Sequence, residues 1–121
     1  MTSPVCGPDL SCTLDATLRI VSGKWKVLVL FYLRQGARRY GEIKRALDGV
    51  SDKVLAQQLK ELEAHRVLVR TDHQEVPPRV DYALTPLGQS LAEAIVPLCT
   101  WGTQNVDAMV RIFGETPSAP G

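Results

Sequence analysis

The chain has 121 residues, of which 45% are hydrophobic and 22% charged, and its formal net charge is +1. This length corresponds to one domain with one modest core, which leaves little room for a deep catalytic cavity. We expect a cytoplasmic protein that does not enter a membrane, because no stretch approaches the roughly 18 apolar residues of a membrane span and the N-terminus lacks the pattern of a secretory signal.

Three cysteines occur in the chain, namely Cys6, Cys12 and Cys99. A small and odd number does not suit a secreted disulfide framework, so we expect free thiols in a reducing cytosol. The sequence has no CxxC motif and no other metal-ligand spacing, so it predicts no metal site and no cofactor. Cys99 falls on an apolar helical face, which favours a small buried hydrophobic residue.

The first predicted elements are two helices separated by a glycine. Residues 1–11 contain two prolines and a glycine and are expected to form a flexible arm. Apolar residues at helical spacing predict a helix over Thr13–Ser22, which Gly23 ends. The segment Lys24–Gln35 is apolar on nearly all sides, as in a helix that is buried around most of its circumference.

A short helix and a longer helix follow, joined by a tight turn. A basic turn at Arg38–Tyr40 precedes the short amphipathic helix, which ends at Gly49. Ser51 is the predicted N-cap of the second helix, over Asp52–His65. The second helix has an apolar stripe of Leu55, Leu59 and Leu62, and an opposite face of Lys53, Ala56, Gln57 and Lys60.

Two strands come next in the predicted order. Residues that are β-branched or alternate in polarity predict strands over Val67–Thr71 and Arg79–Leu84. The segment between them contains Pro77 and Pro78, and two prolines do not fit a paired central strand. We therefore expect a hairpin whose tip lies at these prolines.

A long C-terminal helix completes the predicted order. Thr85 followed by Pro86 is typical of a helix start. Apolar spacing extends the helix to Phe113, and Pro97 is expected to kink or break it near Glu93 to Val96. Residues 114–121 are predicted to form a frayed tail.

The order of a short helix, a tight turn and a second helix with a polar face is that of a helix-turn-helix, and the two strands supply a wing. The second helix can enter the major groove of DNA. Basic charge is concentrated in the same region, since the segment from Lys24 to Arg79 holds twelve Lys/Arg against seven Asp/Glu. The sequence therefore predicts a sequence-specific transcriptional regulator that binds double-stranded DNA.

The residue types indicate how DNA would be contacted. Gln57 suits base edges because its amide offers a donor and an acceptor, whereas lysine and arginine suit phosphates. Arg79, beside the wing prolines, can reach a phosphate or the minor groove. The predicted DNA-contacting residues are Lys24, Arg38, Arg39, Ser51, Lys53, Ala56, Gln57, Lys60, Pro78 and Arg79.

Two other classes of function fit the sequence less well. A winged helix that serves as a protein-interaction module without DNA binding is the alternative. It would have an acidic or apolar face where this chain has Lys53, Gln57 and Lys60. An enzyme would need paired acid/base or nucleophilic groups, and no such motif occurs, so we expect no enzymatic activity.

Five segments carry a resemblance to a known family. They are Gly23–Lys26, Arg38–Ile43, Val50–Glu63, Glu75–Thr85 and Leu87–Gly88. In this order they resemble the HxlR family of bacterial regulators, over roughly residues 12–102. Several motifs in the correct order are more specific than one short motif alone.

The resemblance implies a mainly helical winged helix-turn-helix fold with a small β-hairpin, a dimer through the first and C-terminal helices, and binding to an operator. The apolar stripe of the C-terminal helix also predicts a homodimer, because one small domain cannot cover it, and a two-fold dimer reads an inverted repeat. The winged domain is expected to span residues 12–113, between the arm at 1–11 and the tail at 114–121.

The resemblance also implies that a cysteine near the position of Cys12 can sense oxidants or electrophiles. The start of a helix favours a thiolate, although a small packing residue is the alternative reading of Cys12. A disulfide needs a second thiol, and the candidates are Cys6 and Cys99. The sequence assigns no small-molecule effector.

Overall fold

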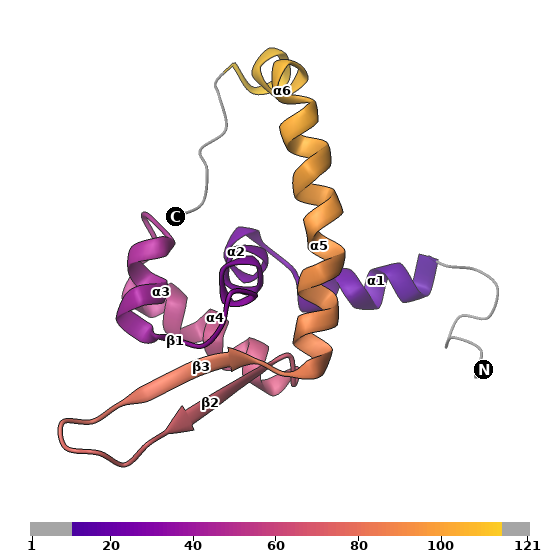
Figure 1. Ribbon diagram of the computed structural model, residues 1–121. Coiled ribbons are helices and arrows are strands. Elements are labelled where there is room, and N and C mark those ends of the chain that lie inside the picture. Colours follow the sequence, from indigo (N-terminus) through magenta and orange to yellow (C-terminus); the bar gives the residue numbers. More distant parts are fainter. Residues whose placement is uncertain (1–10, 115–121) are drawn as a thin grey trace.

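The computed structural model describes residues 11–114, which form six helices and three short strands. In chain order these are α1 (Ser11–Ile20), α2 (Lys24–Leu33), β1 (Arg38–Arg39), α3 (Tyr40–Ala46), α4 (Asp52–Ala64), β2 (Leu68–Asp72), β3 (Val80–Leu84), α5 (Pro86–Gln104) and α6 (Val106–Phe113). Figure 1 shows a body made of α2, α3, α4 and the strands, with α1 and the far end of α5 extending from it. None of these helices is long and apolar enough to cross a membrane. The predicted arm at residues 1–11 lies outside the described residues except for Ser11, where the prediction was wrong because Ser11 is the first residue of α1. The predicted tail at residues 114–121 lies outside them except for Gly114, which is the C-cap of α6.

The core lies where α2, α4 and the first half of α5 meet. The predicted stripe on α4 is confirmed, because Leu55, Leu59 and Leu62 are all buried. The prediction that α2 is buried around most of its circumference is only partly correct. One side of this helix is in the core through Val29, Leu30 and Leu33, and the other side stays partly exposed through Trp25, Val27, Leu28, Phe31 and Tyr32.

The sheet has three antiparallel strands in the order β1-β3-β2. The hairpin of β2 and β3 was predicted, and its register pairs Leu68 with Leu84 and Asp72 with Val80. The expectation of a basic turn at Arg38–Tyr40 was wrong at its first two residues, which form β1 and pair with β3. A strand of two residues is too short to show an alternation of polar and apolar side chains. Its pairing also depends on a distant strand, so the local sequence did not indicate it.

The start of α5 is fixed to the chain just before β2. The Thr85 hydroxyl accepts a hydrogen bond from the Gly88 N–H at 3.0 Å, which confirms the predicted N-cap. The same hydroxyl donates to the Arg66 carbonyl at 2.7 Å. Gly88 is buried, and a Cβ there would lie 1.9 Å from the Val67 carbonyl oxygen. Only a residue without a side chain allows this close approach.

Of the two outcomes expected at Pro97, a kink or a break, the break does not occur. Helix α5 continues through Pro97 and ends at Gln104, and α6 begins as a separate helix after Asn105. Pro97 and Glu93, whose carbonyl loses its helical N–H partner, are both exposed, so water can bind that carbonyl. The break at Asn105 is accompanied by a hydrogen bond from its side-chain Nδ2 to the Trp101 carbonyl at 2.8 Å.

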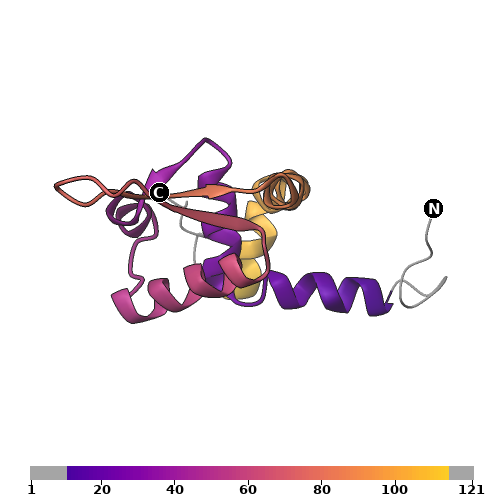
Figure 2. The same ribbon diagram turned by 90° about the horizontal axis from the view of Figure 1, so that it is seen from below.

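Helix α1 and the far end of α5 leave a large apolar surface without cover in one protomer. Figures 1 and 2 both show α1 extending away from the body on the side opposite the hairpin tip. Large apolar side chains are exposed on α1, on the second half of α5 and on α6: Leu14, Leu18, Leu98, Trp101, Ile112 and Phe113. Such a surface is uncommon on a small monomer and is typical of an association surface.

Candidate nucleic-acid interface

The turn between α3 and α4 holds the two helices of the helix-turn-helix in a fixed arrangement. Ile43 and Leu47 are buried at this junction. Gly49 has a φ of +91°, a conformation that residues with side chains rarely adopt, so a glycine lets the chain turn here. The Ser51 hydroxyl then accepts a hydrogen bond from the Val54 N–H at 3.1 Å, which confirms the predicted N-cap of α4.

The first residue of α4, Asp52, is tied to α3 by two side chains. The Tyr40 hydroxyl donates to Asp52 Oδ1 at 2.8 Å, and Lys44 Nζ lies 3.2 Å from the same oxygen. The hydrogen bond from Tyr40, followed by the interactions with Lys44, lowers the pKa of Asp52. Its carboxylate also lies at the positive end of the α4 dipole. These contacts reduce the repulsion that a carboxylate here would exert on a nearby phosphate.

The exposed face of α4 carries the polar side chains that the sequence predicted for it. Lys53, Ala56, Gln57 and Lys60 are all exposed, opposite the buried leucine stripe. None of the salt bridges among the described side chains, residues 13–114, involves Lys53 or Lys60. Both ammonium groups are therefore available to an external anion such as a phosphate.

The two arginines of β1 differ in how far they are already engaged. Arg39 is exposed, and its backbone N–H, rather than its guanidinium, bonds to Glu42 Oε1 at 2.9 Å. Arg38 is half-buried, with its guanidinium 5.5 Å from the centre of the Tyr32 ring and hydrogen-bonded to the Ala37 carbonyl at 2.9 Å. Arg39 is thus the better placed of the two for a phosphate.

Arg79 is held on the wing by Asp81, which sequence reasoning missed. The Arg79 guanidinium lies 3.2 Å from Asp81 Oδ2, and His73 Nε2 lies 3.0 Å from the same oxygen. The hydrogen bond from Arg79 is the largest cause of a lowered pKa of Asp81, with His73 adding to it. Pro78 and the rest of the hairpin tip are exposed. An incoming phosphate would therefore share Arg79 with Asp81.

Lys24 lies at the start of α2, where its ammonium group is 4.5 Å from the centre of the Trp25 ring. Two residues later, Lys26 contacts Glu61 of α4, which places the start of α2 near the second half of α4.

The predicted DNA-contacting residues fall into two groups in the structure. Helix α4 and its N-cap bring together Ser51, Lys53, Ala56, Gln57 and Lys60. The structure places the remaining predicted residues on three other elements: Lys24 on α2, Arg38 and Arg39 on β1, and Pro78 and Arg79 on the wing.

Lys26 and Glu61 are functional candidates that sequence reasoning did not select. Lys26 is only 3% exposed, although it carries a charge. Its ammonium group forms a salt bridge with Glu61, whose other carboxylate oxygen accepts a hydrogen bond from Gln57. The available signals were a lysine within an otherwise apolar helix and an acid four residues after Gln57.

The cysteines are only partly described. The backbone of Cys12 occupies the second position of α1, while its side chain and all of Cys6 lie outside the described residues. Cys99 is exposed on α5, so the prediction of a buried hydrophobic residue was wrong for the single protomer. Among the described residues, no other element of the protomer covers the face of α5 on which Cys99 lies. Within the described part of the chain, no three His, Cys, Asp or Glu side chains gather as a metal site requires.

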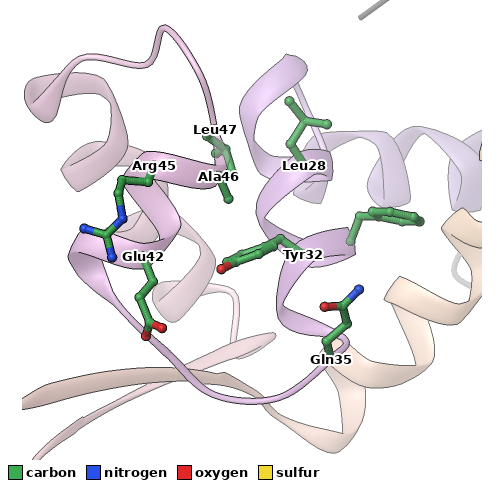
Figure 3. A pocket seen from close by; sticks show the side chains of 8 residues that line it. Leu28, Tyr32, Gln35, Glu42, Arg45, Ala46 and Leu47 are labelled. Atoms are coloured by element: carbon green, nitrogen blue, oxygen red, sulfur yellow. The ribbon is translucent and has the colours of Figure 1, made fainter. Parts of the chain in front are cut away.

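A cavity of about 420 Å³ lies between α2 and α3, on the flank of the helix-turn-helix. Figure 3 shows Tyr32 pointing from α2 toward the side of α3 that carries Glu42 and Arg45. The lining comes from α2, α3 and the adjoining Gln35 and Leu47, and none of it from α4. The cavity is therefore separate from the exposed polar face of α4.

Comparisons with known proteins agree with this geometry. The family described as HxlR-like helix-turn-helix matches residues 20–110. A putative regulatory protein, MalR of Fusobacterium mortiferum, is 43% identical over 95 residues, which cover 78% of this chain and 90% of that protein. The crystal structure of a putative MarR-family transcriptional regulator of Enterococcus faecalis V583 superposes with a TM-score of 0.75 at 38% identity, covering 90% of this chain and 99% of that one. The redox regulator HypR in its reduced form gives a TM-score of 0.77 at 32% identity, with 80% and 96% covered.

Proposed function

The chain belongs to the HxlR-like helix-turn-helix family of transcriptional regulators, and we propose that it binds an operator in double-stranded DNA as a homodimer. The observation that carries this proposal is the exposed face of α4, where Lys53, Gln57 and Lys60 lie opposite a buried leucine stripe. The relatives in this family are regulators, which fits a binding protein and not an enzyme.

In the proposed complex, α4 enters the major groove, which is wide enough for one helix. Gln57 contacts base edges, and Lys53 and Lys60 contact phosphates on either side of the groove. Arg39, and more weakly Arg38, adds phosphate contacts from β1. The wing, through Pro78 and Arg79, reaches the neighbouring backbone or minor groove. Ser51, Ala56 and Lys24 complete the proposed surface.

The exposed apolar side chains of α1, α5 and α6 support the homodimer. Leu98 and Trp101 on α5 and Phe113 on α6 are each more than half exposed in the protomer. Burying such side chains against a second copy removes apolar surface from water, which stabilises the dimer by about 25 cal/mol for each Å² of apolar surface buried. A two-fold dimer would read an inverted repeat with half-site centres one helical turn apart, about 34–36 Å.

A gel-shift assay with the DNA upstream of the protein's own gene tests DNA binding. We expect a retarded complex that resists competition by unrelated DNA and weakens in Lys53→Ala and Lys60→Ala. Arg111→Ala, which removes one positive charge from the exposed surface of α6, outside the proposed DNA-contacting residues, is the matched control and should bind as the wild type does. A protein-interaction module without DNA binding would give no specific complex with any of these proteins.

We further propose that Cys12 is a thiol switch. Its backbone position in the first turn of α1 supports this, because free N–H groups and the helix dipole stabilise a thiolate there. The similarity to the redox regulator HypR, solved in reduced and oxidised forms, adds support. A peroxide would oxidise the thiolate to a sulfenic acid, and a second thiol would displace water to form a disulfide.

The partner thiol is either Cys6 of the same chain or Cys99 of the partner subunit. Diamide treatment, followed by non-reducing electrophoresis and gel shift, distinguishes them. A bond to Cys99 links two chains, so the protein migrates as a dimer, and this band disappears in Cys99→Ser. A bond to Cys6 lies within one chain, so the protein still migrates as a monomer, and the bond disappears in Cys6→Ser. If Cys12→Ser loses DNA affinity on oxidation as the wild type does, Cys12 is not the switch.

A further inference from the structure

The buried ammonium group of Lys26 has a specific partner on the neighbouring helix. Lys26 is 3% exposed, and its Nζ lies 2.5 Å from Glu61 Oε1 and 3.5 Å from the Ser22 hydroxyl. A buried charge is costly unless it is paired, so the ammonium group holds the Glu61 carboxylate in place. The salt bridge links α2, which is part of the core, to α4.

The second oxygen of the same carboxylate is bonded to Gln57. Gln57 Nε2 donates to Glu61 Oε2 at 2.6 Å, one helical turn away on α4. A carboxylate only accepts hydrogen bonds, so the amide of Gln57 must turn its nitrogen toward Glu61. The hydrogen bond from Gln57, followed by that from Lys26, lowers the pKa of Glu61, so the carboxylate stays ionised.

We infer that Lys26 and Glu61 are positioning residues that fix the orientation of the Gln57 amide and thereby set the base it reads. This inference rests on the proposed function, in which α4 enters the major groove. With one N–H bound to Glu61, Gln57 keeps its oxygen as an acceptor and its second N–H as a donor. That pair matches adenine, whose N6 donates and whose N7 accepts in the major groove. Without Glu61 the amide can turn by 180° and present the two groups in the opposite order.

The inference predicts a result that simple destabilisation cannot produce. Glu61→Gln removes a negative charge near the DNA, so its affinity for random-sequence DNA should rise or stay unchanged. In this variant the single amide oxygen at position 61 stays with the buried Lys26 ammonium group, so position 61 turns N–H groups and no acceptor toward Gln57. The preference for adenine at the base opposite Gln57, about 5- to 150-fold for one bidentate contact, should therefore fall severalfold. A variant that was merely less well folded would lose affinity for all DNA and keep its relative preference.

The experiment selects an operator from a random duplex library with the wild-type protein and then measures binding to the four base variants at the Gln57 position. Glu63→Gln is the matched control, because it removes the same charge from the exposed side of α4, and no hydrogen bond is described between Glu63 and Gln57. Its base preference should equal that of the wild type. Lys26→Met with Glu61→Met removes the buried charge together with its partner, so neither charge is left buried alone, and leaves Gln57 no acceptor at position 61. This double variant should lose the preference as the single variant does.

The outcomes separate the inference from the function on which it rests. If the library yields no enriched sequence, the proposed DNA binding itself fails. If the library does yield an enriched sequence, and Gln57→Ala lowers the base preference while Glu61→Gln and the double variant keep it, the positioning role of Lys26 and Glu61 is wrong. If adding Glu61→Gln to Gln57→Ala changes nothing further, the two residues act through one contact, as we infer.

Discussion

Replacing Gly88 with alanine should destabilise the winged domain, because at this glycine α5 lies directly against the backbone of Val67, just before β2. The added Cβ would lie 1.9 Å from the Val67 carbonyl oxygen. That oxygen accepts a hydrogen bond from the Thr85 N–H at 3.2 Å, so it cannot turn away without breaking a contact at the start of α5. The Thr85 hydroxyl, bonded to the Arg66 carbonyl at 2.7 Å, holds the same segment. Alanine must therefore push the two segments apart.

The expected size of the effect follows from these distances. Ordinary contact begins near 3.4 Å, so α5 and the Val67 backbone must separate by about 1.5 Å. Overpacking of this kind costs about 1–3 kcal/mol, and weakening a buried hydrogen bond adds about 1 kcal/mol. We expect Gly88→Ala to lower the free energy of unfolding by about 3 kcal/mol, which is a large part of the roughly 5–15 kcal/mol that stabilises a domain.

Urea denaturation measures this change, at one fixed protomer concentration because a dimer unfolds in a concentration-dependent way. Gly41→Ala on α3 is the matched control. Its Cβ would meet only the end of the Arg45 side chain, at 3.6 Å, so it should be neutral or stabilising by up to about 1 kcal/mol. If Gly88→Ala unfolds within about 0.5 kcal/mol of the wild type, the close approach of α5 to Val67 is not a rigid constraint.

Three further predictions concern the DNA-binding surface, the dimer and the wing. Arg39→Ala should weaken binding to all sequences and reduce the salt dependence of log Kd by about one unit, and an unchanged slope would refute its phosphate contact. Trp101→Asp should weaken dimerisation at least about tenfold, because it places a charge in the proposed interface. Light scattering over a dilution series measures the dissociation constant of the dimer, and a constant equal to that of the wild type would exclude Trp101 from the interface. The lowered pKa of Asp81 means that its stabilising contribution is present above the unfolded value of 3.8 and is lost as the pH falls through the lower folded value. Asp81→Asn should therefore show a shallower loss of stability with acid than the wild type, and equal slopes in urea unfolding would contradict this role.

The features that the sequence predicted correctly have local signals. Ser51 before α4 and Thr85 before α5 are N-caps whose partners lie three residues ahead, so a short window contains both sides of the contact. The two faces of α4 follow in the same way from the spacing of its leucines. The candidate DNA-reading residues of α4 lie on the face opposite these leucines, so the leucine spacing alone was enough to predict that they are exposed together.

The features that the sequence did not predict depend on distant partners. Strand β1 exists because Arg38 and Arg39 pair with β3, more than forty residues later. Lys26 is buried because Glu61 meets its charge from another helix. Pro97 does not end α5, because its position on the exposed side lets water serve the carbonyl that loses its partner. In each case tertiary context outweighed a local rule.

Selection of binding sites from a random duplex library by the purified wild-type protein tests the central claim most directly, since it depends on both the reading face of α4 and the two-fold dimer. We expect an enriched inverted repeat whose half-site centres lie about 10–10.5 base pairs apart, with one protein dimer bound per site. Failure to enrich any sequence, or enrichment of a single half-site bound by one protomer, would contradict a homodimer that reads its operator through α4.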